Sequence, residues 1–127
     1  MSIDVLWVGV GGAVGAITRY MFGLWIAERL GTSFPWGTMV INITGSLLIG
    51  LILTVLTDKV VADPAWRLLL VVGFLGGYTT FSSYTFEVLA LASAGEWIFA
   101  LAYVLGSNVI GLLAVVLGAM VAHLVWR

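Results

Sequence analysis

The chain has 127 residues, of which 62% are hydrophobic and only 9% are charged, and its formal net charge is −1. Soluble globular proteins carry about 25% charged residues, so this composition excludes an ordinary water-facing surface and predicts an integral membrane protein of one domain, residues 1–127. The low charge without a basic cluster argues against nucleic acid as a partner, and the absence of cysteine excludes disulfides and thiolate chemistry.

Four apolar segments are long enough to cross a lipid bilayer as helices, which takes about 20 residues each. The expected spans are Val5–Ala27, Trp36–Thr57, Arg67–Leu91 and Trp97–Trp126. Tryptophan prefers the membrane interface, and all six tryptophans fall near the end of an expected span: Trp7, Trp25, Trp36, Trp66, Trp97 and Trp126. The sequence therefore predicts an all-α, multi-pass protein with four transmembrane helices.

The first span carries small residues and one cation at four-residue spacing, which places Gly11, Gly15, Arg19 and Gly23 close to one face of a helix. Glycines at this spacing are typical of close helix packing. An arginine inside a span is costly unless it faces water or a partner. Arg19 is thus either a snorkelling or structural residue paired with a carboxylate or a group that attracts anions into an aqueous vestibule.

The second span has a similar stripe formed by Asn42, Ser46 and Gly50. A buried asparagine can join helices by hydrogen bonds. Its amide can equally offer two N–H donors to a passing anion without adding a charge. The sequence leaves both interpretations of Asn42 open.

The third span contains the most informative segment of the chain, the uncharged run from Gly73 to Tyr84. Within it, the adjacent glycines Gly76 and Gly77 and then two threonines are poor at continuing a helix. We therefore expect this helix to be broken in the middle of the membrane. Such a break is tolerated only where the freed backbone groups meet protein, water or an ion, which makes it the first candidate for a site.

The polar groups expected inside the membrane are mostly neutral hydrogen-bond donors accompanied by one cation. Tyr103 and Ser107 share a face of the fourth span, and Phe81 and Tyr84 lie one turn apart in the third. Glu87, near the end of the third span, is the only embedded carboxylate, and the sequence leaves its role open. No catalytic triad, metal-ligand cluster or phosphate loop is present, so we do not expect an enzyme.

These motifs resemble those of a known family, the Fluc/CrcB fluoride channels. The resemblance covers nearly the whole chain and is most specific in the third span; its segments are Gly11–Tyr20, Trp36–Thr38, Asn42–Ser46 and Gly73–Ser82. It implies a passive channel that exports fluoride across the plasma membrane, the inner membrane of a bacterium. It also implies an antiparallel, dual-topology homodimer with two pores along the subunit interface.

The resemblance further implies which residues form the site. Backbone carbonyls of Gly76 and Thr79 from both chains would hold a structural sodium ion at the centre of the dimer. Arg19 would lie in the vestibule. The fluoride path would use the ring edge of Phe81, the amide of Asn42 and a track of hydroxyls that includes Ser82, Ser83, Tyr103 and Ser107.

Tyr84 departs from the family pattern, because the second pore phenylalanine of the family corresponds to this tyrosine. The position either still presents the electropositive edge of a ring or adds a hydroxyl to the path. From the sequence we favour the ring edge, because Tyr84 lies one helical turn from Phe81 and repeats its geometry.

Two alternative functions remain open at this stage. A small dual-topology multidrug or cation exporter is also a four-span dimer, but it would need a carboxylate in the first span, where this chain has Arg19. A non-transporting assembly subunit would use its glycine stripes for packing alone. Basic residues divide three to one between the two sides, with Lys59, Arg67 and Arg127 opposite Arg29, which is a weak bias that permits insertion in both orientations.

Overall fold

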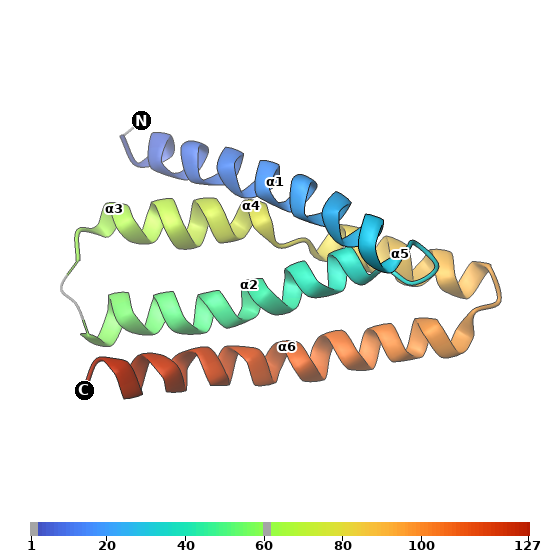
Figure 1. The fold of residues 1–127 in the computed structure, drawn as a ribbon. Coiled ribbons are helices and arrows are strands. Elements are labelled where there is room, and N and C mark those ends of the chain that lie inside the picture. Colours follow the sequence, from blue (N-terminus) through green and yellow to red (C-terminus); the bar gives the residue numbers. More distant parts are fainter. Residues whose placement is uncertain (1–2, 60–61) are drawn as a thin grey trace.

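A computed structural model describes residues 3–59 and 62–127, which form helices joined by short turns (Figure 1). In chain order the elements are α1 (Ile3–Leu30), α2 (Trp36–Thr54), η1 (Val55–Lys59), α3 (Pro64–Trp66), η2 (Arg67–Leu75), α4 (Gly76–Tyr78), α5 (Phe81–Ser93) and α6 (Trp97–Val125). The segments η1 and η2 have the wider winding of a π-helix. They continue α2 and connect α3 to α4, respectively, without an intervening loop.

Among the described residues, four helical stretches are long and apolar enough to cross a membrane: Ile3–Leu30, Trp36–Asp58, Pro64–Ser93 and Trp97–Val125. The all-helical class and the number of spans are therefore as predicted, and the protein is a multi-pass membrane protein. The chain reverses direction at each connection, so that the two ends of the chain lie on the same side of the bundle (Figure 1).

Turn and cap residues set the ends of these helices. Gly31 after α1 and Gly95 after α5 both have a φ of +80°, a conformation that favours glycine and commonly ends helices. At the start of α3, the Asp63 carboxylate accepts a hydrogen bond of 2.8 Å from the Ala65 N–H, and Pro64 occupies the first helical position.

Glycines allow two pairs of helices to approach with their backbones in contact. A Cβ atom on Gly15 of α1 would lie 2.9 Å from the Tyr78 backbone nitrogen, and one on Gly118 of α6 would lie 2.8 Å from the Leu51 nitrogen. Both distances are too short for a side chain. The stripe in the first span thus serves close packing, of α1 against η2 and α4, while α6 packs against α2 in the same way.

Two extended residues separate α4 from α5. Thr79 has φ −84° and ψ 157°, and Thr80 has φ −150° and ψ 116°. The hydroxyl oxygen of Thr80 then accepts a hydrogen bond of 3.2 Å from the Ser83 N–H, which caps the start of α5. Threonine is a weak helix former and a good cap, so this local sequence starts a new helix at Phe81.

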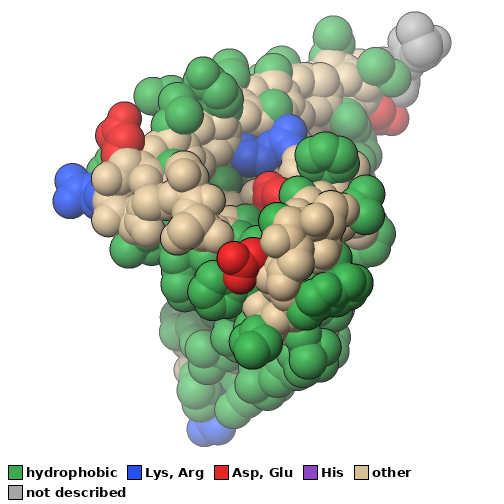
Figure 2. Space-filling model, turned by 90° about the vertical axis from the view of Figure 1, so that its right-hand side faces the viewer, with side chains coloured by type: hydrophobic (Ala, Val, Ile, Leu, Met, Phe, Trp, Pro, Cys, Tyr) green, Lys and Arg blue, Asp and Glu red, His purple; other side chains and the backbone are tan. Residues whose placement is uncertain are grey.

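Large apolar side chains cover much of the outside of the bundle, among them Leu6 and Ile17 of α1 and Leu112 of α6. Figure 2 looks at the end of the molecule that contains the turn between α5 and α6, and hydrophobic atoms cover the flanks there. Such a surface is suited to hydrocarbon or to another protein chain rather than to water.

Candidate functional site

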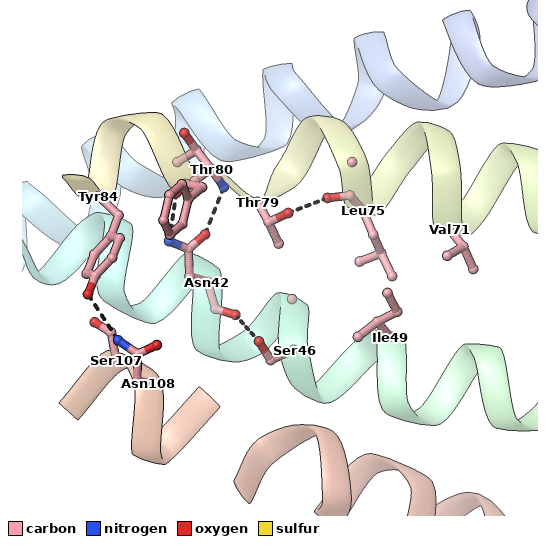
Figure 3. A pocket seen from close by; sticks show the side chains of 13 residues that line it. Asn42, Ser46, Ile49, Val71, Leu75, Thr79, Thr80, Tyr84, Ser107 and Asn108 are labelled. Atoms are coloured by element: carbon pink, nitrogen blue, oxygen red, sulfur yellow. Dashed lines mark hydrogen bonds between the residues drawn. The ribbon is translucent and has the colours of Figure 1, made fainter. Parts of the chain in front are cut away.

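The polar groups of three spans meet at a cavity of about 430 Å³ beside the extended Thr79–Thr80 segment (Figure 3). The wall contains no charged side chain. It is formed by Asn42, Gly45, Ser46 and Ile49 of α2, by Val71, Leu75 and Gly76, by Thr79, Thr80, Phe81 and Tyr84, and by Ser107 and Asn108 of α6. Six residues that the sequence indicated as site residues line this one cavity: Asn42, Gly76, Thr79, Phe81, Tyr84 and Ser107.

Asn42 connects α2 to the extended segment through two hydrogen bonds, as Figure 3 shows. Its Nδ2 donates to the Thr80 carbonyl at 2.9 Å, and its Oδ1 accepts from the Thr80 N–H at 2.8 Å. The amide side chain thereby satisfies both backbone groups of a residue that lies outside any helix. Asn42 does join helices, and one N–H of its amide remains for another acceptor.

This arrangement also changes the partners of the Gly76 carbonyl. In an uninterrupted helix the Thr80 N–H would donate to Gly76, but here it donates to Asn42. Thr79 follows α4 and is extended, so its carbonyl lies outside the helix. Both carbonyls belong to residues of the cavity wall, and backbone oxygens are the ligands that hard cations prefer.

Two aromatic rings lie at the start of α5. Phe81 is 76% exposed, whereas Tyr84 is only 8% exposed, and their ring centroids are 5.7 Å apart. The Tyr84 ring also meets the edge of Tyr103 in a T-shaped contact, with centroids 5.1 Å apart. Its hydroxyl accepts a hydrogen bond of 3.1 Å from Nδ2 of Asn108 (Figure 3). The sequence did not indicate Asn108 as a site residue.

Ser107 provides a hydroxyl without a partner at this cavity. Its Oγ is buried and forms no hydrogen bond with the part of the chain that the structure describes. The Ser46 hydroxyl, by contrast, donates to the Asn42 backbone carbonyl at 2.8 Å. A buried hydroxyl without a partner is costly, so Ser107 is a group that a water molecule or an ion would satisfy.

A second cavity of about 540 Å³ contains the charged groups. Arg19 and Glu87 both lie on its wall, together with Thr38, Ser83 and Thr80, and Thr80 also lines the first cavity. Figure 2 shows a recess at this end of the molecule in which basic and acidic groups lie near each other. Within residues 3–59 and 62–127, Arg19 forms no ion pair. The carboxylate partner of a structural arginine is therefore not found among the described residues of the same chain.

Glu87 is held by two hydroxyl groups. Thr38 donates to its Oε1 and Tyr103 donates to its Oε2, each at 2.7 Å. Tyr103 is completely buried, and it lines neither of the two cavities. The expected hydroxyl track is therefore divided in this chain: Ser107 faces the first cavity, Ser83 faces the second, and Tyr103 is bound to Glu87.

Ser82 lies apart from both cavities. It is exposed at the start of α5, and its Oγ is 3.5 Å from the Thr80 hydroxyl.

The described residues contain no cluster of three histidine, cysteine or acidic side chains that could hold a metal ion. A cation at this site would therefore depend on backbone and hydroxyl oxygens.

Comparison with known proteins agrees with this architecture. Residues 6–119 match the family described as "CrcB-like protein, Camphor Resistance (CrcB)". The chain is 52% identical to a protein of Acidobacterium capsulatum over 93% of this chain and 94% of that one, and 50% identical to a protein of Koribacter versatilis over 91% of both. It is 48% identical to one of Hydrogenobaculum over 96% of this chain and 99% of that one.

All three relatives carry the name fluoride-specific ion channel FluC, and they are named as channels, not as enzymes. The match extends over the four spans and both sides of the Thr79–Thr80 segment, and it agrees with the resemblance found in the motifs of the first three spans. The chain belongs to the CrcB-like family of FluC ion channels.

Proposed function

We propose that this protein is a passive channel that conducts fluoride out of the cell. The observation that carries the proposal is the first cavity, where neutral hydrogen-bond donors converge without a charged side chain on the wall. Ser107 has no partner there, and Asn42 has one uncommitted N–H. The choice of fluoride as the anion is supported by the names of the relatives, which are called fluoride-specific ion channels.

The chemistry of this wall suits a small, strongly hydrated anion. Fluoride entering the membrane loses water, and each lost water must be replaced by a donor. Hydroxyls and an amide supply such donors, and the edge of an aromatic ring is electropositive. Because these groups are neutral, they can stabilise the ion without binding it so tightly that it cannot leave.

We further propose that two chains assemble as an antiparallel homodimer with two fluoride paths along the interface. Support comes from the side chains that one chain leaves exposed: the apolar ring of Phe81 and the polar amide of Asn108 belong to the cavity wall and yet are not covered within the chain. A second chain would close the cavity on this side. The near-balanced basic residues at the two ends permit the opposite insertions that such a dimer requires.

A structural sodium ion at the centre of this dimer is part of the proposal. Its ligands would be the backbone carbonyls of Gly76 and Thr79 from each chain. Support comes from the Asn42–Thr80 hydrogen bonds, which withdraw the Thr80 N–H from the Gly76 carbonyl. The extended segment would be the predicted break of the third helix and would lie at the middle of the membrane. The relatives are bacterial, so the proposed location is the bacterial inner membrane.

The function is tested by reconstitution. Purified protein in liposomes loaded with fluoride should release the anion when a potassium ionophore balances the charge, whereas liposomes loaded with chloride should retain it. An ion-selective electrode for each halide measures the release, and protein-free liposomes give the background. Equal release of both halides would contradict the selectivity, and no release of either would support a non-transporting subunit instead.

Dual topology is tested with a tag at the C-terminus in intact bacterial cells. An antiparallel dimer should place about half of the tags on each side of the membrane, because each chain contributes one orientation. A cysteine introduced in the tag and a membrane-impermeant thiol reagent measure the accessible fraction, and lysed cells give the total. Labelling of either all or none of the tags in intact cells would show a single orientation.

No observation favours the multidrug exporter. The carboxylates of α1 are Asp4 in its first turn and Glu28 near its end, and neither lies in the central part of this span. Cation export coupled to protons would need a carboxylate there.

A further inference from the structure

The hydroxyl of Tyr84 and the amide of Asn108 form a pair whose hydrogen-bond direction is fixed. Nδ2 of Asn108 donates to the Val104 carbonyl at 2.8 Å, and the same nitrogen donates to the Tyr84 hydroxyl at 3.1 Å. A carbonyl can only accept, so the atom facing Val104 must be the amide nitrogen rather than the amide oxygen. Both hydrogens of this nitrogen are therefore used, one on each acceptor.

The Tyr84 oxygen consequently acts as an acceptor toward Asn108, and its own proton remains to be donated elsewhere. This oxygen forms no other hydrogen bond with the described residues. Tyr84 is 8% exposed, so bulk water does not surround it. A buried hydroxyl of this kind is an available donor next to the cavity whose wall it helps to form.

Tyr84 lines two neighbouring cavities of the expected fluoride path. A third cavity, of about 330 Å³, is lined by Phe81, Tyr84, Thr85, Val88, Val104 and Asn108. Phe81, Tyr84 and Asn108 also line the first cavity, so these three side chains form the partition between the two. On the proposed path, an ion that moves from one cavity to the other would pass beside these shared side chains.

Resting on the proposed function, we propose that Asn108 is a positioning residue for fluoride transfer across this partition. By donating to the Tyr84 oxygen, Asn108 directs the Tyr84 O–H toward the ion. The neighbouring hydroxyl of Ser107, which also has no partner within residues 3–59 and 62–127, is the second donor on the same side. In this proposal the tyrosine acts through its hydroxyl, which is the alternative to the ring-edge interpretation favoured from the sequence.

The Tyr84 hydroxyl is expected to affect the transport rate because a hydrogen bond to an ion is strong. Donation to an anion by a partly desolvated hydroxyl is stronger than donation between neutral groups. The loss of one such bond at the point where the ion is least hydrated corresponds to a decrease of about tenfold in rate. A hydroxyl that rotates freely would give only part of this effect.

A double-mutant cycle tests the proposal with the full-length protein in fluoride-loaded liposomes. Tyr84→Phe should lower fluoride release by about tenfold. Asn108→Leu, which removes the amide at similar volume, should lower it by about threefold or more. In the Tyr84→Phe background, Asn108→Leu should have no further effect, because the amide has no hydroxyl left to orient.

Tyr78→Phe is the matched control. Tyr78 is also buried, and its hydroxyl lies 2.8 Å from the Thr44 hydroxyl, but it lines neither the first nor the third cavity. This variant removes the same group, and it should release fluoride within about twofold of the wild type. Elution of each variant as a single species in detergent establishes that it is assembled, and Asn108→Ala replaces the leucine variant if that one fails to purify.

The outcomes separate this inference from the proposed function. If the wild type releases fluoride and Tyr84→Phe releases it at the same rate, the inference is overturned, whereas the proposed fluoride channel is not. An Asn108→Leu effect of equal size in both backgrounds would show that Asn108 serves packing only, which also overturns it. Absence of fluoride release by the wild type would refute the proposed function, and the inference would fall with it.

Discussion

Asn42→Asp should reduce fluoride release from liposomes to the level of protein-free liposomes. An aspartate can still accept the Thr80 N–H, but it cannot donate to the Thr80 carbonyl, 2.9 Å from the present nitrogen. It would place a carboxylate next to a carbonyl oxygen and on the wall of the cavity. The negative charge repels fluoride, and within the membrane this repulsion is only weakly screened.

A second variant at Asn42 separates the effect of the added charge on fluoride release from the effect of the lost hydrogen bonds. Asn42→Leu has a similar volume and no charge, but it leaves both backbone groups of Thr80 without their partner. Release by the leucine variant above that of the aspartate variant would measure the contribution of charge. Elution as the same assembled species as the wild type is the control for folding. Near-normal fluoride release by Asn42→Asp would remove Asn42 from the path.

Tyr84→Ile should lower fluoride release by at least about tenfold, because it removes both the ring and the hydroxyl. The ring lies 5.1 Å from Tyr103 and 5.7 Å from Phe81, so isoleucine would also take away two aromatic contacts at the partition. The electrode measurement used for the wild type gives the rate. This variant should be impaired at least as strongly as Tyr84→Phe.

Phe86→Ile is the matched control for this change. Phe86 lies on the same helix, is 69% exposed and lines none of the three cavities at the site, so the same loss of a ring should leave fluoride release unchanged. Unimpaired release by Tyr84→Ile would show that the aromatic residues of α5 serve only as packing.

The sequence predicted those features that depend on local composition. The four spans follow from continuous apolar segments, and the glycine packing follows from a four-residue period on α1. The cap that Thr80 forms at the start of α5 is a property of neighbouring residues, whereas Gly76 and Gly77, which were expected to weaken the helix, lie inside α4. Membership of the family followed from motifs such as Gly73–Ser82, which the comparison supports.

The hydrogen-bond partners could not be predicted in the same way. Asn42 and Thr80 are 38 positions apart, and Asn108 and Tyr84 are 24 positions apart, so only the packing of α2, α5 and α6 brings them together. Tyr103 was expected in a hydroxyl track, but its contact with Glu87 depends on a rotation of α6 that no periodicity specifies. The sequence did not indicate Asn108 as a site residue, because a single amide beside a serine on a long apolar helix is equally compatible with a lipid-facing surface.

The pair of hydrogen bonds between Asn42 and Thr80 has a mechanical consequence. A hydrogen bond in each direction resists both separation and sliding, so α2 and the start of α5 are expected to move as one body. Any conformational change that moved α2 against the start of α5 would have to break both bonds. In the proposed channel, the wall that contains Asn42 and Thr80 would therefore keep its shape while fluoride passes.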